Sequence, residues 1–324
     1  MKTIEHLSAL HKIKLLADPR RLEILRLLMG RPSTLTQLGE QLDRSPAWVR
    51  HHVKALEDAG LVTLIAVRTT GRVTEKYYEA TAGALLVEEL ILPKSRIPAM
   101  IFAGSHDLAL QAAADHLAKR RMLLALYVGS LNGLIHLRQG LCQLTGTHLR
   151  DDNGTYNVAY VHHLFPEGGV ELFTLAYRTQ GLMLAPGNPK AIVDLEDLAR
   201  PGIRLVQRNA GSGTRLWLDG ELARQDIAPA LVQPTGADVD THTEAANLIR
   251  AGKADVAVGL EAAALASGLD FLPLFEERYD LVAPRGRLRE LSPLLDYIQT
   301  AEFRTSLHLF AGYDAAHSGE HVLF

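Results

Sequence analysis

Three glycine-serine segments of this 324-residue chain hold the side chains best suited to binding a small anion. Each follows an apolar run typical of a buried strand and precedes a stretch with helical spacing; they are Gly104-Ser105, Gly129-Ser130 and Gly211-Ser212-Gly213-Thr214-Arg215. Glycine lets the backbone approach a ligand closely, hydroxyl groups donate hydrogen bonds, and helix N-termini present free N–H groups. One such segment alone is as easily a helix cap. Three at equivalent positions favour a shared anion site, with Arg215 adding charge compensation.

Further polar residues lie beside these segments. His106 and Asn132 belong to the first two loops, and Thr241 with His242 opens another helical stretch that could face the same cleft. Thr241 near Glu244 also fits a helix cap, so both interpretations stay open. The candidate ligand-binding residues are Ser105, His106, Ser130, Asn132, Ser212, Thr214, Arg215, Thr241 and His242.

Other chemistries fit the sequence poorly. The third segment lacks the GxxxxGK[ST] pattern of a nucleotide P-loop, and no glycine stands two residues before Ser212 as in a hydrolase elbow. No nucleophile, base and orienting group are evident together, so we expect no enzyme and no catalytic residues. Adjacent helical side chains such as His51 and His52 point about 100° apart and cannot readily share a metal. The single cysteine, Cys142, excludes an internal disulfide and a cysteine-based metal site. We therefore expect neither a metal nor a cofactor.

From Ala99 onward, short apolar runs alternate with helical stretches, which predicts parallel α/β sheets. The segment GVELFTLAYRTQGLMLAP reads as two strands, and after LDFLPL the segment ERYDLVAP reads as a strand. Ligands of such sheets bind beyond the carboxyl ends of the strands, where helix N-termini converge. The glycine-serine segments lie at these ends.

The first 80 residues show a different pattern. Helices are predicted from Pro19 to Met29 with Asp18 as cap, from Thr34 with a Thr34–Gln37 capping box, and from Pro46 to Gly60. Two strands then follow, joined by a basic tip at residues 68–72. This is winged helix-turn-helix geometry, in which the third helix suits the major groove and the wing reaches phosphates or the minor groove.

The candidate DNA-binding residues lie on the third predicted helix and on the wing. They are Ser45, Trp48, Arg50, His51, His52, Lys54, Arg68, Thr70 and Arg72. A winged helix that serves only protein interaction is the alternative.

The segments LADPRRLEILRLL, SPAWVRHHVKALEDAGLV and GRVTEKYY resemble the ArsR-type winged-helix repressors over residues 10–80. The resemblance implies a homodimer on a palindromic double-stranded DNA operator. Metal sensing, usual in the founding members, needs Cys or His clusters that this segment lacks.

Residues 99–314 resemble the substrate-binding domains related to periplasmic molybdate- and tungstate-binding proteins, in particular cytoplasmic versions fused to helix-turn-helix regulators. The matching segments are FAGSHDLAL, GSLNGLIHLRQG, HLRDDNGTYN, RNAGSGTRLWLD, GKADVAVGLEAAA, LDFLPLFEERYDLV and FRTSLHLFAGYD. The resemblance implies a type II binding-protein fold of two α/β lobes, with crossovers near Ala176–Arg178 and Leu281–Ala283. It also implies that Ser105 and Ser130 bind a tetrahedral anion. His106 departs from the molybdate pattern and also fits a larger or organic ligand.

The expected fold class is multidomain: an α+β winged helix followed by a two-lobed α/β type II periplasmic-binding-protein-like domain. We expect a DNA-binding domain at 1–80, a linker at 81–98 with an apolar helix over Thr81–Leu92, and a ligand domain at 99–324. Lobe I would hold residues 99–176 and 284–324, and lobe II residues 177–282. The helix would contact the second copy of the dimer or the ligand domain.

Charge and hydropathy agree with this division. Residues 1–94 carry 14 Lys and Arg against 11 Asp and Glu, and the remainder carries 20 against 26. A mildly basic head is expected where only the head approaches phosphates. No run of about 20 apolar residues and no signal sequence is present, so we expect a cytoplasmic protein without a membrane partner.

The sequence thus predicts a ligand-responsive DNA-binding regulator with a small anion as effector, molybdate or tungstate first. Two alternatives stay open. The effector could be another small polar or organic metabolite, or the second domain could serve only for dimerisation.

Overall fold

The computed structural model describes residues 3–323 except 8, 72, 88, 89 and 152. The chain forms two compact units that divide between Pro93 and Lys94. Among the described helices, none combines the length and apolar composition that a membrane crossing requires.

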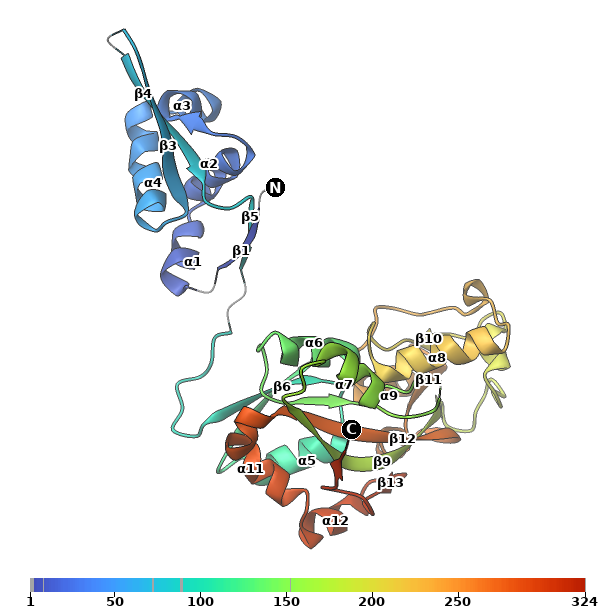
Figure 1. The fold of residues 1–324 in the computed structure, drawn as a ribbon. Coiled ribbons are helices and arrows are strands. Elements are labelled where there is room, and N and C mark those ends of the chain that lie inside the picture. Colours follow the sequence, from blue (N-terminus) through green and yellow to red (C-terminus); the bar gives the residue numbers. More distant parts are fainter. Residues whose placement is uncertain (1–2, 8, 72, 88–89, 152, 324) are drawn as a thin grey trace. The chain divides into compact units, whose positions relative to one another are not determined.

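The first unit is a winged helix (Figure 1). Its order is β1 (Ile4–Leu7), α1 (Leu10–Leu16), α2 (Pro19–Gly30), β2 (Ser33–Thr34), α3 (Leu35–Leu42), α4 (Pro46–Asp58), β3 (Val62–Thr70), β4 (Val73–Ala80) and β5 (Ala84–Val87). Strands β2, β4 and β3 form one antiparallel sheet. Buried residues of α2, α3 and α4, including Ile24, Leu38 and Val53, fill the core.

Local sequence signals set the helix boundaries. The Asp18 carboxylate accepts from the backbone N–H of Arg20 at 3.0 Å and starts α2. Thr34 and Gln37 form the expected capping box at the start of α3. These caps satisfy N–H groups that have no partner inside the helix, which is why the predicted starts are confirmed.

The helix predicted over Thr81–Leu92 is wrong. Residues 84–87 form β5, which pairs in parallel with β1, and residues 90–98 contain no helix. The Ala84–Val87 backbone finds its hydrogen-bond partners in a strand about 80 residues earlier in the chain, and apolar periodicity does not reveal such a pairing.

The second unit begins with lobe I elements β6 (Ala99–Gly104), α5 (Leu108–Leu117), β7 (Met122–Tyr127), α6 (Ser130–Arg138), β8 (Thr145–Thr147) and α7 (Val158–Leu164). The chain continues through β9 (Val170–Leu184), β10 (Leu205–Val206), α8 (Gly213–Arg224), α9 (His242–Arg250), β11 (Val256–Leu260), α10 (Glu261–Ala266) and β12 (Asp270–Pro284). It ends with α11 (Leu288–Tyr297), α12 (Ala301–Leu307), β13 (Tyr313–Asp314) and β14 (His321–Val322). Short 3₁₀ turns lie at Glu196–Ala199, Pro229–Leu231 and Arg285–Arg287.

Two long antiparallel strands join the lobes. β9 and β12 pair along their whole length and lie at the centre of the sheet order β10-β11-β9-β12-β8 (Figure 1). The segment predicted as two strands is therefore the single 15-residue strand β9, and the strand predicted at ERYDLVAP is the second half of the 15-residue strand β12. β12 absorbs the irregularity at Pro273 as a register shift.

The cores show where the chain crosses between lobes. Ala176 and Leu281 belong to the lobe I core, whereas Leu182 belongs to the lobe II core. The β9–β12 register places Tyr177 opposite Arg278, so both crossings lie at the same level. The first crossing agrees with the sequence. The second, expected at Leu281–Ala283, lies earlier in the chain, near Arg278, because antiparallel pairing ties it to the first.

Candidate functional site

The glycine-serine segments of the two lobes meet. The Leu131 N–H donates to the carbonyl of Gly211 across the lobes at 3.1 Å. A Cβ on Gly129 would lie 2.6 Å from the backbone nitrogen of Ser212, and Gly129 also has φ +83°. Glycine is thus required at 129 for both space and conformation. The arrangement buries Ser105, Ser130, Ser212 and Thr214.

Helix N-termini converge with these loops. α6 begins at Ser130, α8 begins after the cap Ser212, and α9 begins at His242. The Ser212 hydroxyl accepts from the Arg215 N–H at 3.2 Å, and Thr241 forms a capping box with Glu244. The cap interpretation of Thr241 is therefore confirmed for its hydroxyl, and its neighbour His242 is buried in the same region.

His148 engages the two predicted serines. Its Nε2 lies 2.8 Å from Ser105 Oγ, and its backbone N–H donates to Ser130 Oγ at 3.2 Å. Its Nδ1 lies 2.6 Å from Glu277 Oε2. His148 and Glu277 are not among the residues predicted from the sequence, in which no nucleophile, base and orienting group are evident together. Ser105, His148 and Glu277 do form such a chain of hydrogen bonds.

Glu277 is held ionised by its neighbours on the crossover strands. It accepts from Arg178 Nε at 3.0 Å and from Gln180 Nε2 at 2.7 Å. Burial, the largest single effect, would raise its pKa, but the charges of Arg178 and His148 and the hydrogen bonds from His148 and Gln180 together outweigh burial and lower the pKa to about 2. Because the carboxylate accepts the Nδ1 proton of His148, the Nε2 of a neutral His148 accepts from Ser105. A charged residue inside a mostly apolar strand was the available signal for Arg178, whereas Glu277 lies between Glu276 and Arg278 and does not stand out in the sequence.

A second buried cation, Arg208, is incompletely paired. Its Nη2 and Nε donate to the carbonyls of Asp240 at 2.8 Å and Val239 at 3.3 Å, while Nη1 has no partner among the described residues. Burial lowers its pKa to about 10, so it is charged at neutral pH. A buried guanidinium with a free donor is costly unless an acceptor pairs with it.

Two buried imidazoles accompany Arg208. The rings of His106 and His242 lie 6.0 Å apart and come from opposite lobes. Neither nitrogen of His242 has a hydrogen-bond partner among the described residues, and neither does Nδ1 of His106. Together with Arg208 they supply unsatisfied polar atoms that an enclosed anion would pair with.

The remaining predicted residues have other partners. The Arg215 guanidinium pairs with Asp219 at 2.9 Å, so its charge is already balanced. Thr214 Oγ1 hydrogen-bonds Gln180, and the exposed Asn132 donates to the Val128 and Ala210 carbonyls at the lobe contact.

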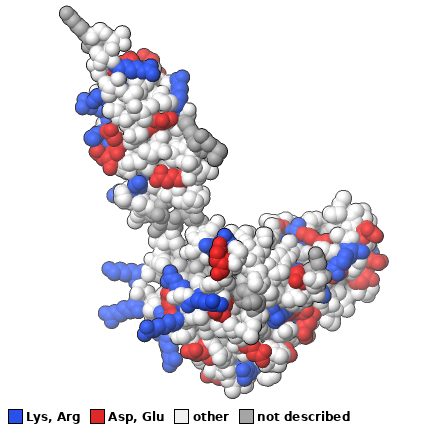
Figure 2. Space-filling model, viewed as in Figure 1, with Lys and Arg blue, Asp and Glu red and all other residues white. Residues whose placement is uncertain are grey.

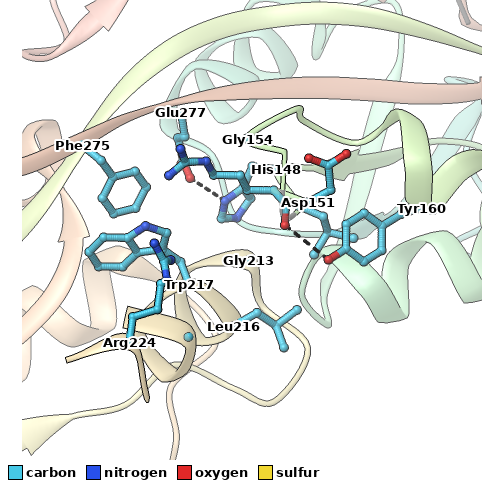
Figure 3. Close-up of a pocket in the computed structure, with 13 residues that line it drawn as sticks. His148, Asp151, Gly154, Tyr160, Gly213, Leu216, Trp217, Arg224, Phe275 and Glu277 are labelled. Carbon is cyan, nitrogen blue, oxygen red and sulfur yellow. Dashed lines mark hydrogen bonds and ion pairs between the residues drawn. The ribbon is translucent and has the colours of Figure 1, made fainter. Parts of the chain in front are cut away.

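A cavity of about 640 Å³ lies between the lobes (Figure 3); its lining includes His148 and Glu277 but not Arg208, His106 or His242. Trp217 and Phe275 line one side, Tyr160 and Asp151 the other, with His148 and Gly213 between them. A Cβ on Gly213 would lie 2.7 Å from the His148 ring, so the ring packs directly on the start of α8.

In the first unit, most predicted DNA-binding residues are exposed on α4 and the wing. Arg50, His51, Lys54, Arg68 and Thr70 are exposed, and Ser45 caps α4. His52 is a correction: it is 5% exposed, because it shares the buried face with Val49 and Val53. Trp48 is half-buried against His52, and Arg72 lies outside the described residues.

Lys54 is paired with Asp58 at 2.7 Å. In the view of Figure 2, Lys and Arg side chains of this unit alternate with Asp and Glu, which matches its small net charge. Among the described residues no group of three or more His, Cys, Asp or Glu side chains is placed to hold a metal.

Comparison with known proteins defines both parts of the chain. Residues 112–299 match the model of the PBP superfamily domain. The chain belongs to the PBP superfamily. Residues 18–63 match the family of bacterial regulatory proteins named arsR, so this PBP-superfamily protein carries an ArsR-type helix-turn-helix before its ligand-binding domain.

Among known proteins, the uncharacterized protein YvgK of Bacillus subtilis (strain 168) is 33% identical over 226 residues, which cover 69% of this chain and 73% of YvgK. The sulfate-binding protein SubI from Mycobacterium tuberculosis H37Rv is similar with a TM-score of 0.49 and 17% identity, over 67% of this chain and 86% of SubI. The tungstate ABC transporter structure from Geobacter sulfurreducens has a TM-score of 0.47 and 13% identity, over 66% and 97%. Similarity at this level does not indicate a ligand.

Proposed function

We propose that this PBP-superfamily protein is a transcriptional regulator whose DNA affinity is set by a small anion bound between the two lobes. The observation that carries the proposal is the buried Arg208, whose Nη1 has no hydrogen-bond partner among the described residues, together with the buried imidazole of His242, which has none among them either. Helix N-termini at Ser130 and Ser212 add N–H groups and favourable dipoles. The effector proposed first is a tetrahedral oxyanion, molybdate or tungstate.

In this proposal the ArsR-type unit is the part of the chain that binds DNA. We propose that α4 and the wing contact double-stranded DNA and that two copies bind a palindromic operator in the cytoplasm. The exposed apolar side chains of Ile4, Leu86 and Val87 on the β1–β5 pair support contact with a second copy. Ligand acts through its different affinities for the DNA-binding and non-binding forms.

The Ser105–His148–Glu277 chain suggests a hydrolase as the competing function. Three features favour the regulator. The Ser105 side chain is completely buried. The backbone N–H of Ser105 donates to the Gly146 carbonyl, so it is not free to stabilise the oxyanion of a hydrolysis intermediate. The Glu277 carboxylate is also shared with Arg178 and Gln180, whereas a triad acid serves its histidine.

A thermal-shift panel tests the sensor proposal. The full chain is heated with molybdate, tungstate, sulfate, phosphate and small organic acids in turn. A ligand at 100 times its Kd stabilises the chain by about 2.7 kcal/mol, which is a clear rise in melting temperature. If an organic acid alone shifts the melting temperature, the effector is a metabolite and not an oxyanion. If no compound does, the second unit is not a sensor of these ligands.

A further inference from the structure

The charges buried around the cleft do not balance a doubly charged anion. Arg178 is fully buried and lies between Asp107, at 2.8 Å, and Glu277. The two carboxylates and the one guanidinium together carry a net charge of −1. Arg208 supplies one positive charge, so the cluster is neutral as long as its histidines are neutral. An entering dianion would leave two uncompensated negative charges in a buried region, which is very costly.

The His106–His242 pair is the group able to respond. Both rings are buried, they lie 6.0 Å apart, and three of their four nitrogens have no hydrogen-bond partner among the described residues. A neutral imidazole has one N–H donor, while an imidazolium has two and carries a positive charge. Two imidazolium rings this close would repel each other. The pair would therefore take up one additional proton and not two.

The groups that face the pair explain why it is neutral before a ligand enters. Burial, followed by the charges of Arg208 and Arg178, holds the pKa of His242 well below its ordinary value; His106 and His148 act in the same direction. Burial and Arg208 lower the pKa of His106 to about 4, against the opposing effects of Asp107 and Gln111. His242 also stands in the first turn of α9, where the helix dipole disfavours a cation.

We propose, building on the anion site described above, that this cleft binds a doubly charged tetrahedral oxyanion together with one proton, which the His106–His242 pair takes up. The anion reverses the local field, so the imidazolium becomes the favoured form and one of its N–H groups donates to an oxyanion oxygen. Binding then strengthens as pH falls, because the complex holds one more proton than the separate partners. The dissociation constant changes by up to about tenfold per pH unit between the pKa values of the pair in the free and bound protein.

Tungstate and perrhenate provide a matched pair of probes, since both are tetrahedral MO₄ anions of similar size but carry two charges and one. Titration calorimetry of the full chain at a pH of about 7.5, in HEPES and in Tris, measures the protons exchanged from the difference in observed heat. The expected result is uptake of close to one proton with tungstate or molybdate and none with perrhenate. The variant H242Q keeps an amide donor but cannot titrate, so proton uptake and the pH dependence of binding should fall. The exposed His308 gives the control H308Q, which should change neither.

The possible failures are distinguishable. If tungstate and molybdate bind without proton uptake, this inference is wrong while the anion site stands. If uptake persists unchanged in both H242Q and H106Q, another group takes the proton and the assignment to the pair is overturned. If none of the three anions binds the folded wild-type chain, the proposed anion site fails and this inference fails with it. Circular dichroism of each variant establishes that it is folded before it is titrated.

Discussion

The guanidinium of Arg208 is buried, and within the part of the chain that the structure describes one of its nitrogens has no acceptor. Such a group destabilises a folded chain unless a ligand pairs with it, which is the usual compromise at a binding site. Its two other contacts, to backbone carbonyls, aim the guanidinium without neutralising it. Arg215 differs from Arg208 because Asp219 already balances its charge.

Replacement of Arg208 by glutamine should therefore separate binding from stability. We expect R208Q to weaken oxyanion binding about 10- to 100-fold, since a charge-assisted hydrogen bond is lost. The melting temperature without ligand should stay the same or rise. The matched control R215Q should retain binding. Equal loss of binding in the two variants, measured by calorimetry, would show that Arg208 has no special part.

Glu277 differs from Arg208 because its buried carboxylate is paired with Arg178, Gln180 and His148. E277Q should destabilise the chain by about 3–5 kcal/mol, because Arg178 loses the stronger of its two carboxylate partners. Chemical denaturation measures the change, with the exposed neighbour variant E276Q as control. The lowered pKa of Glu277, about 2, adds stability that is present above its ordinary pKa of 4.5 and is lost as pH falls toward 2. Similar stability of the two variants at neutral pH would contradict this role.

Among the helices and strands, local sequence patterns predicted the helix starts correctly. They did not predict the strands that form by pairing between distant segments of the chain. Asp18 and the Thr34–Gln37 box were readable because a cap involves residues two or three positions apart. The β1–β5 pair was not readable, since its strands are apart in sequence and neither alternates clearly. The continuity of β9 and β12 also depends on mutual pairing.

The candidate site was likewise predictable only where its residues follow a local sequence pattern. The glycine-serine segments could be found because loops with glycine, serine and a following helix have a local signature. His148, Glu277 and Arg208 could not, because each acts on residues from a distant segment: His148 contacts Ser105, and Glu277 contacts Arg178. Their roles exist only after β9 and β12 have brought the lobes together.

The start of α8 tests the contact between lobes. Alanine at 213 favours the helix within lobe II by up to about 1 kcal/mol relative to glycine. Its Cβ would nevertheless lie 2.7 Å from the His148 ring and 2.8 Å from the His148 carbonyl oxygen of lobe I. G213A should thus weaken ligand binding by hindering closure, as calorimetry would show.

Gly220 provides the control on the same helix, since a Cβ there would meet nothing within 4 Å. G220A should raise stability without changing ligand affinity. If G213A binds ligand as tightly as G220A, closure does not need the close packing of His148 on α8.

At the scale of the whole molecule, an ArsR-type unit and a PBP-superfamily domain are joined in one chain. The first unit carries only a small positive excess, and Lys54 is already paired with Asp58. In the dimer that we propose, DNA affinity with few net phosphate contacts depends strongly on how the two copies are held, and we propose that the ligand-binding domain changes this.

The most direct test of the central proposal is the affinity of the full chain for its own upstream DNA, measured by fluorescence anisotropy at fixed salt with and without the oxyanion that raises its melting temperature. We expect a change in dissociation constant of about 5- to 150-fold, in either direction, corresponding to a coupling free energy of about 1–3 kcal/mol. An unchanged dissociation constant with the oxyanion demonstrably bound would contradict it.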